Sequence, residues 1–244
     1  MDEVTWLDIR VDLYSFVISV GMIVAYHIII AQKVRKNPAY TLRSVMNCAR
    51  AAWVRSVMTA NRDILAVQPL RNSTMAATFL ASTSILLIIG VLTLSEQGDK
   101  LGATWHVLGV VGATKQEMWL TKLIVLLLDL FVAFFSFALS IRLFNLVGYM
   151  INVPLALGHK MISPDHVAAE LNLAGMWYGI GMRAYYYLVP LVMWLFGPHF
   201  MVLSTPVLLL VVFLTDHFPR KAGRRSPVEN FDTIGSKQPE ARVP

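Results

Sequence analysis

The chain has 244 residues, of which 56% are hydrophobic and only 15% are charged, and its mean hydropathy is +0.59. Soluble domains carry about 25% charged residues, so this composition excludes an ordinary soluble enzyme and a disordered protein, and a single cysteine, Cys48, excludes a disulfide scaffold. A formal net charge of +6 would favour nucleic acid as the partner of a soluble protein. Here the basic residues flank apolar runs, so we expect a lipid bilayer as the partner and no nucleic acid.

An acidic segment precedes the first apolar run. Residues 1–12 contain four acidic residues and one arginine, and residues 13–31 contain no charge. A run of about 20 apolar residues spans the hydrocarbon core of a bilayer. Because the leading segment is acidic rather than basic, it is not typical of a cleaved signal peptide. We therefore predict an extracytoplasmic N-terminus over residues 1–12 and an uncleaved membrane helix over residues 13–31.

The segment after this run is basic. Residues 33–71 contain eight basic residues and one acidic residue, so the positive-inside rule places the loop 33–72 in the cytoplasm. Within the loop, residues 41–61 have the spacing of an amphipathic helix, with Thr41 as its N-cap. One face carries Leu42, Val45, Met46, Ala49, Trp53 and Val57, and the other carries Arg43, Asn47, Arg50 and Val54. Such a helix either lies on anionic lipid headgroups or covers the cytoplasmic ends of the membrane helices.

Two further apolar runs each have the length of one span. They cover residues 74–94 and residues 120–141, and the second contains Asp129. The segment from residue 95 to residue 122, which ends just inside the second predicted span, balances three lysines against three acidic residues, which is consistent with an extracytoplasmic position.

The last apolar region, residues 171–215, is too long for one crossing at about 1.5 Å per residue. It contains Gly197-Pro198, where proline removes a backbone donor and glycine weakens a helix. We therefore predict two helices, over residues 174–196 and 199–216, joined by a tight turn. If the region were one kinked helix, the chain would have four spans instead of five.

Charge favours the five-span alternative. Four basic residues lie between positions 220 and 225, and a single last helix would leave them outside the cell, against the positive-inside rule. Ser163-Pro164-Asp165 predicts a helix start that leads into the fourth span, because serine caps, proline suits the first turn and an acid suits the positive end. Residues 219–244 lose their apolar residues, so we predict a disordered cytoplasmic tail.

The predicted fold class is therefore all-α. Residues 13–218 form a polytopic transmembrane helical bundle of about five spans with a cytoplasmic amphipathic helix. The predicted location is the inner (plasma) membrane, with the N-terminus outside and the C-terminus in the cytoplasm.

Two charged residues inside the predicted spans are the main site candidates, Asp129 and Arg183. A charge at membrane depth is costly, so it usually faces the bundle interior and has a partner. Three interpretations stay open: the two side chains pair with each other, Arg183 reaches the inner headgroups while Asp129 is neutral or hydrogen-bonded, or the two form a proton or substrate relay.

Neither a metal site nor a catalytic site is expected. The six histidines lie at different predicted depths, so they do not offer paired haem ligands, and we expect no metal and no cofactor. The phosphate-binding, dinucleotide-binding, nucleophile-elbow and zinc-protease motifs do not occur. We therefore name no catalytic residue.

Several strings together resemble a known membrane family. They are Asn61-Arg62-Asp63, the run from Ala66 to Asn72, the run from Met75 to Ala81, Arg183-Ala184-Tyr185-Tyr186, Pro190, Trp194 and Gly197-Pro198. In this order they resemble the bacterial and plant membrane proteins of the domain of unknown function 599 family, over residues 12–218. The resemblance implies a membrane fold and no particular activity. It also makes five polar residues at the predicted cytoplasmic face candidate sites, namely Asn61, Arg62, Asp63, Arg71 and Asn72.

Three functions are compatible with these observations. The scarcity of polar groups in the spans favours a non-catalytic accessory or scaffolding component of a membrane complex, whose partners are other membrane proteins or a second copy of the chain. A small transporter or permease that uses Asp129 and Arg183 is an alternative. A lipid-handling membrane enzyme, with the polar residues of 61–72 at headgroup level, is a second alternative.

Overall fold

The computed structural model describes residues 3–36, 42–60, 63–96, 116–155 and 162–216, and every regular element in these ranges is a helix. The helices are α1 (Glu3–Lys36), α2 (Leu42–Thr59), α3 (Asp63–Glu96), α5 (Gln116–Met150), α6 (Pro164–Phe196) and α7 (Pro198–Asp216). The predicted all-helical bundle is confirmed.

Four of these helices are long and apolar enough to cross a membrane: Ile9–Lys36 in α1, Val67–Glu96 in α3, Met118–Met150 in α5 and Pro198–Thr215 in α7. A helix of 34 residues, such as α1 or α3, is about 51 Å long, whereas the hydrocarbon core is about 30 Å thick. The helices therefore extend beyond the predicted spans, because hydropathy marks the depth of lipid and not the last hydrogen-bonded turn.

Helix α6 is not among the four. It carries Arg183 and a run of three tyrosines, Tyr185 to Tyr187, which lower its mean hydropathy. It also packs against both α5 and α7 and has eight buried residues, so protein surrounds much of it. The predicted span over residues 174–196 lies within α6, and its crossing of the membrane stays a prediction.

The chain breaks between α6 and α7 at Gly197. Its φ of 155° and ψ of 158° lie in a region that only glycine adopts readily, and its N–H donates to Met193 O at 3.3 Å. Pro198 then begins α7. The last apolar region thus forms two helices, as Gly197-Pro198 predicted. At the other end of α6, Ser163 is the N-cap and its hydroxyl accepts from His166 N at 3.3 Å.

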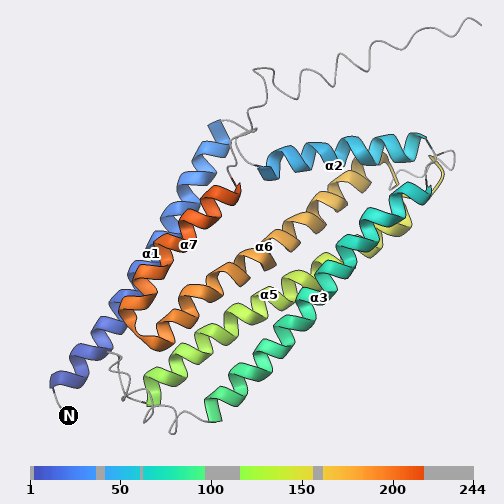
Figure 1. Cartoon of the computed structure of the whole chain (residues 1–244). Helices are drawn as coiled ribbons and strands as arrows, with labels where there is room; N and C mark the ends of the chain where they lie inside the picture. The colour runs from blue at the N-terminus through green and yellow to red at the C-terminus, as the bar shows by residue number, and fades with distance from the viewer. Residues whose placement is uncertain (1–2, 37–41, 61–62, 97–115, 156–161, 217–244) are drawn as a thin grey trace, which may run out of the picture.

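The helices form two groups joined by α6. Figure 1 shows α1 beside α7 on one flank and α3 beside α5 on the other, with α6 between them; these neighbours are in contact. The two groups diverge toward the end at which α1 and α7 finish, and α2 lies across that end. The end of α7 therefore lies at the α2 end of the molecule, which is the arrangement that a tight turn after α6 requires.

Helix α2 docks through a different face from the predicted one. Val54, placed on the polar side, is fully buried together with Val57 and Met58, whereas Leu42 and Met46 are exposed. The buried residues pack against α3, α5 and α6 in one apolar cluster. The prediction is wrong for this face because it assigned docking to apolar residues alone, whereas Asn47 and Arg50 contact α6 through polar groups. Val57, on the predicted apolar side, is buried as expected. Thr41 lies outside the described residues.

Small residues allow close packing in the middle of the bundle. A Cβ atom on Gly181 of α6 would lie 2.8 Å from the ring of Phe137, which is fully buried. Ala81, Ala133 and Ala184 complete this cluster between α3, α5 and α6. Small residues let membrane helices approach closely enough for van der Waals packing, which replaces the hydrophobic effect in lipid.

Candidate functional site

A buried ion pair joins three helices at the end of the bundle opposite α2. Lys122 Nζ of α5 lies 2.9 Å from Asp12 Oδ1 of α1, and their side chains are 5% and 0% exposed. Trp194 of α6 donates its indole N–H to the same Asp12 oxygen at 2.9 Å. The Trp194 ring also stacks on Phe16, with ring centroids 5.0 Å apart, and lies 5.4 Å from the Lys122 ammonium.

This arrangement compensates charges that would be costly in isolation. Removing a carboxylate and an ammonium from water costs several kcal/mol each, and good geometry with additional hydrogen bonds is needed to offset it. The indole N–H and the aromatic face supply such interactions. The Asp12–Lys122–Trp194 cluster therefore holds α1 to α5 and α6, although α1 packs mainly against α7.

The sequence did not predict this cluster. Asp12 was placed in the N-terminal segment, and Lys122 was counted with the charges of a balanced loop. One available signal was that the two residues have opposite charges and stand at equivalent ends of apolar runs. Their separation of 110 positions hid the contact.

Below the ion pair, two buried oxygens lack a hydrogen-bond partner among the described residues: Ser19 Oγ and Asp129 Oδ2. Ser19 follows Asp12 by seven residues in α1, and Asp129 follows Lys122 by seven residues in α5. Seven residues are two turns, so each oxygen lies on the same helix face as the ion pair and about 10 Å further along. Both residues therefore face the interior of the bundle.

Asp129 lies on α5 with a buried carboxylate oxygen, and Arg183 is partly buried on the neighbouring helix α6. Neither residue lines either of the two grooves described below. The three interpretations of Asp129 and Arg183 therefore stay predictions.

Tyrosines of α6 connect it to both flanks. Tyr187 Oη lies 3.0 Å from His27 Nε2 of α1, and His27 Nδ1 lies 2.9 Å from the carbonyl of Ile23. These residues line a shallow apolar groove of about 480 Å³ between α1 and α6. On the other side, Tyr185 donates to the Leu80 carbonyl and its hydroxyl lies 2.8 Å from Ser84 Oγ of α3.

Polar contacts also attach α2 to α6. Arg55 pairs with Asp165 at 2.8 Å, with both side chains largely exposed. Asn172 Nδ2 donates to the Asn47 carbonyl at 3.3 Å. The Arg50 guanidinium lies against Gly175. Arg50 Cζ is 2.6 Å from the position that a Cβ atom on Gly175 would take. Burial of Arg50 and the neighbouring Arg43 lower the pKa of this guanidinium.

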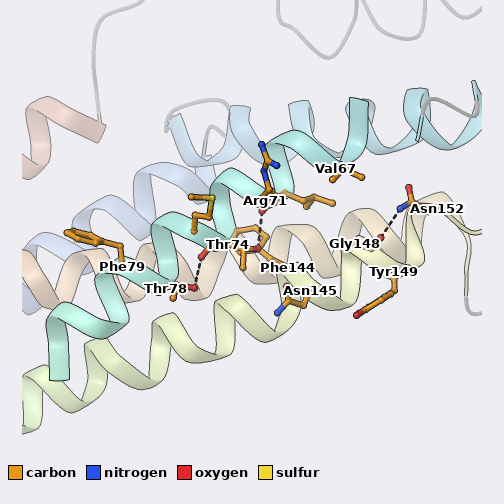
Figure 2. A pocket seen from close by; sticks show the side chains of 12 residues that line it. Val67, Arg71, Thr74, Thr78, Phe79, Phe144, Asn145, Gly148, Tyr149 and Asn152 are labelled. Atoms are coloured by element: carbon orange, nitrogen blue, oxygen red, sulfur yellow. Dashed lines mark hydrogen bonds between the residues drawn. The ribbon is translucent and has the colours of Figure 1, made fainter. Parts of the chain in front are cut away.

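A second groove lies between α3 and α5 near the α2 end, with a volume of about 710 Å³. Arg71 is exposed at this groove, and Figure 2 shows its guanidinium directed away from α5. Asn72 is exposed on α3 and does not line the groove. Asp63 is the first residue of α3, and its side chain lies outside the described part, as do Asn61 and Arg62.

Within the described ranges, no three His, Cys, Asp or Glu side chains are grouped closely enough to hold a metal ion. The cysteine of the chain, Cys48, is exposed on α2 as a free thiol.

Apolar helices of membrane-spanning length, with polar contacts buried between them, define an integral membrane protein with a polytopic helical bundle. The model of the family described as "Protein of unknown function, DUF599" matches residues 14–221, and the chain belongs to this family. The resemblance drawn from the sequence is confirmed over nearly the same residues. No curated protein and no solved structure matches the chain.

Proposed function

We propose that the protein is a non-catalytic accessory component of a complex in the plasma membrane, and that α1 contacts the partner. One observation carries the proposal: only 11% of the most apolar stretch of α1 is buried inside the chain, against 28% for α3 and α7 and 33% for α5. A helix that makes so few contacts within its own chain has most of its surface available to lipid or to another protein.

The exposed face of α1 has the composition of a helix–helix interface. Gly21 and Ala25 are four residues apart and exposed, and no atom of the chain lies within 4 Å of the position of a Cβ atom on Gly21. Val17 and Val24, which flank them on the same face, are 58% and 49% exposed. Two small residues at this spacing let a second membrane helix approach closely. The partner is accordingly a transmembrane helix, of another protein or of a second copy.

Substitution of Gly21 by leucine tests the proposal. The full chain, purified from its native membranes in mild detergent, is expected to carry a stoichiometric partner or to form a dimer by light scattering. Gly21→Leu is expected to lose that partner, because the added side chain fills the contact surface without touching its own chain. Gly90→Leu is the matched control, since Gly90 is equally open and lies on α3. A wild-type monomer without a partner would contradict the proposal.

A specific observation also favours a second candidate, a small permease. Ser19 and Asp129 place two unpaired oxygens on inward faces of membrane helices, and ionisable residues at such positions often belong to substrate or proton pathways. Under this candidate, proteoliposomes would show a flux that Asp129→Asn abolishes and that Ser82→Ala, an exposed site on α3, leaves unchanged. Equal flux in the Asp129→Asn variant would eliminate the candidate.

A further inference from the structure

The groove between α3 and α5 is apolar along most of its length and polar at one end. Met75, Phe79 and Phe144 supply apolar surface, and Met75 and Phe79 are 64% and 73% exposed. Among the described residues that line this groove, Arg71 is the only charged one. Along α3 the lining residues run from Val67 to Phe79, a rise of about 18 Å, which is comparable to the depth of one leaflet.

Three polar residues follow one another at the same end. Asn145 and Tyr149 are one turn apart on α5, and Asn152 lies in the turn that follows the helix. Asn152 Nδ2 donates to the Gly148 carbonyl at 3.2 Å, which leaves the amide oxygen of Asn152 as an acceptor. Tyr149 is 81% exposed. Figure 2 shows Asn145 and Tyr149 on α5 and Asn152 just beyond its end.

The hydroxyl groups deeper in the groove are already used. Thr74 donates to the Leu70 carbonyl and Thr78 donates to the Thr74 carbonyl, both at 2.9 Å (Figure 2). An unpaired hydroxyl donor covered by an acyl chain would oppose binding of that chain. Because both hydroxyls already donate to backbone carbonyls, an acyl chain can cover them without this cost. The groove thus combines an apolar channel with a cationic, hydrogen-bonding rim.

We propose that this groove binds one anionic glycerophospholipid of the leaflet on the α2 side. The exposed Arg71 side chain, directed away from α5 in the structure, turns toward the groove and pairs with the lipid phosphate. Asn145, Tyr149 and Asn152 hydrogen-bond the headgroup, and one acyl chain lies along Met75, Phe79 and Phe144. The charge of the site suits an anionic lipid. No acidic side chain is among the described residues that line the groove, and residues 33–71 carry eight basic residues against one acidic residue. Arginine and phosphate form strong charge-assisted hydrogen bonds, and a basic flank attracts anionic lipid.

The site is separate from the surface proposed for a partner helix. Arg71 and Tyr149 belong to α3 and α5, and Figure 1 places these helices on the flank opposite α1. Loss of lipid binding and loss of a protein partner are therefore distinguishable.

Native mass spectrometry of the full, delipidated chain tests the proposal. The probes are phosphatidylglycerol and phosphatidylcholine with identical acyl chains, and glycerol 3-phosphate as a headgroup without chains. We expect one phosphatidylglycerol per chain, bound about tenfold more tightly than phosphatidylcholine. An excess of glycerol 3-phosphate is expected not to displace the lipid, because the acyl chain contributes to binding.

Two variants and two matched controls locate the site. Arg71→Gln is expected to reduce phosphatidylglycerol binding about tenfold, to the level of phosphatidylcholine, while Arg142→Gln, at an exposed arginine of α5 outside the groove, leaves it unchanged. Gly148 lines the groove and no atom lies within 4 Å of its Cβ position, so Gly148→Leu fills the groove without disturbing the fold and weakens binding of both lipids. Gly90→Leu is its control.

Three results would overturn the proposal. The first is equal binding of the two lipids to the wild-type chain, which indicates non-specific annular lipid. The second is unchanged phosphatidylglycerol binding in Arg71→Gln or in Gly148→Leu. The third is displacement of the lipid by glycerol 3-phosphate, which would identify a soluble phosphate ligand instead of a phospholipid.

Discussion

The buried ion pair between Asp12 and Lys122 is where single residues matter most to stability. Lys122→Met leaves the Asp12 carboxylate buried without its cation, which costs about 3–5 kcal/mol in the free energy of unfolding. Adding Asp12→Asn removes the charge and keeps an oxygen for the Trp194 N–H, so the double variant is expected to be more stable than Lys122→Met alone. Chemical or thermal unfolding in detergent measures both.

The exposed pair of Arg55 and Asp165 provides the contrast. Their side chains are 63% and 75% exposed, so Arg55→Gln is expected to change the free energy of unfolding by at most about 1 kcal/mol. If Arg55→Gln proved as destabilising as Lys122→Met, burial would not determine how much each ion pair contributes to stability.

Gly175 and Gly179 form a second matched pair, one turn apart on α6. Alanine at Gly179 meets no atom within 4 Å and is expected to stabilise the helix by up to about 1 kcal/mol. Alanine at Gly175 displaces the Arg50 guanidinium, so α2 is held less firmly. Hydrogen exchange of the α2 amides is expected to be faster in Gly175→Ala and unchanged in Gly179→Ala; equal rates in the two variants would contradict the assigned contact.

At the residue scale, local signals were more informative than distant ones. Ser163 could be recognised as a cap because serine, proline and aspartate act within one turn. Asp12 and Lys122 were not paired, because their opposite charges at equivalent ends of apolar runs are a weak signal across a separation of 110 positions. The docking face of α2 was misassigned at Val54, because the spacing of apolar residues does not reveal that polar residues such as Arg50 also contact a neighbouring helix.

At the scale of elements, the break between α6 and α7 depends on one glycine. Gly197→Ala forces a side chain into a backbone conformation that glycine alone adopts readily, which costs about 1–3 kcal/mol. We expect a correspondingly lower free energy of unfolding in detergent, with Gly21→Ala, at an open helical site, as the control. No loss of stability in Gly197→Ala would indicate that the turn relaxes to another conformation.

The hydrophobic runs predicted that the helices exist better than they predicted whether lipid or protein surrounds each helix. The runs in α1, α3, α5 and α7 were recognisable because lipid imposes a minimum apolar length. Arg183 and the tyrosines of α6 leave it without a stretch as apolar as those of the other four helices. Helices α5 and α7 cover part of α6, so these side chains lie in a protein environment. Hydropathy does not distinguish a helix shielded by its neighbours from one that lies outside the membrane.

At the scale of the whole molecule, the polar contacts are divided between the two ends. The end opposite α2 is held by Asp12 and Lys122 beside Trp194, while α2 attaches to the other end through Arg55 and Arg50. The helices diverge between α1 and α3 on the α2 side (Figure 1). We therefore expect the α2 end of the molecule to face one side of the membrane as a unit.

Cysteine labelling from each side of the membrane tests this topology most directly, because Cys48 is the only native cysteine and is exposed on α2. The probes are Cys48 itself and, in a Cys48→Ser background, Glu96→Cys at the end of α3 and Thr215→Cys near the end of α7. A membrane-impermeant maleimide is expected to label only Glu96→Cys in intact cells, and Cys48 and Thr215→Cys only in inverted vesicles. Labelling of Thr215→Cys in intact cells would show that α6 and α7 do not both cross the membrane.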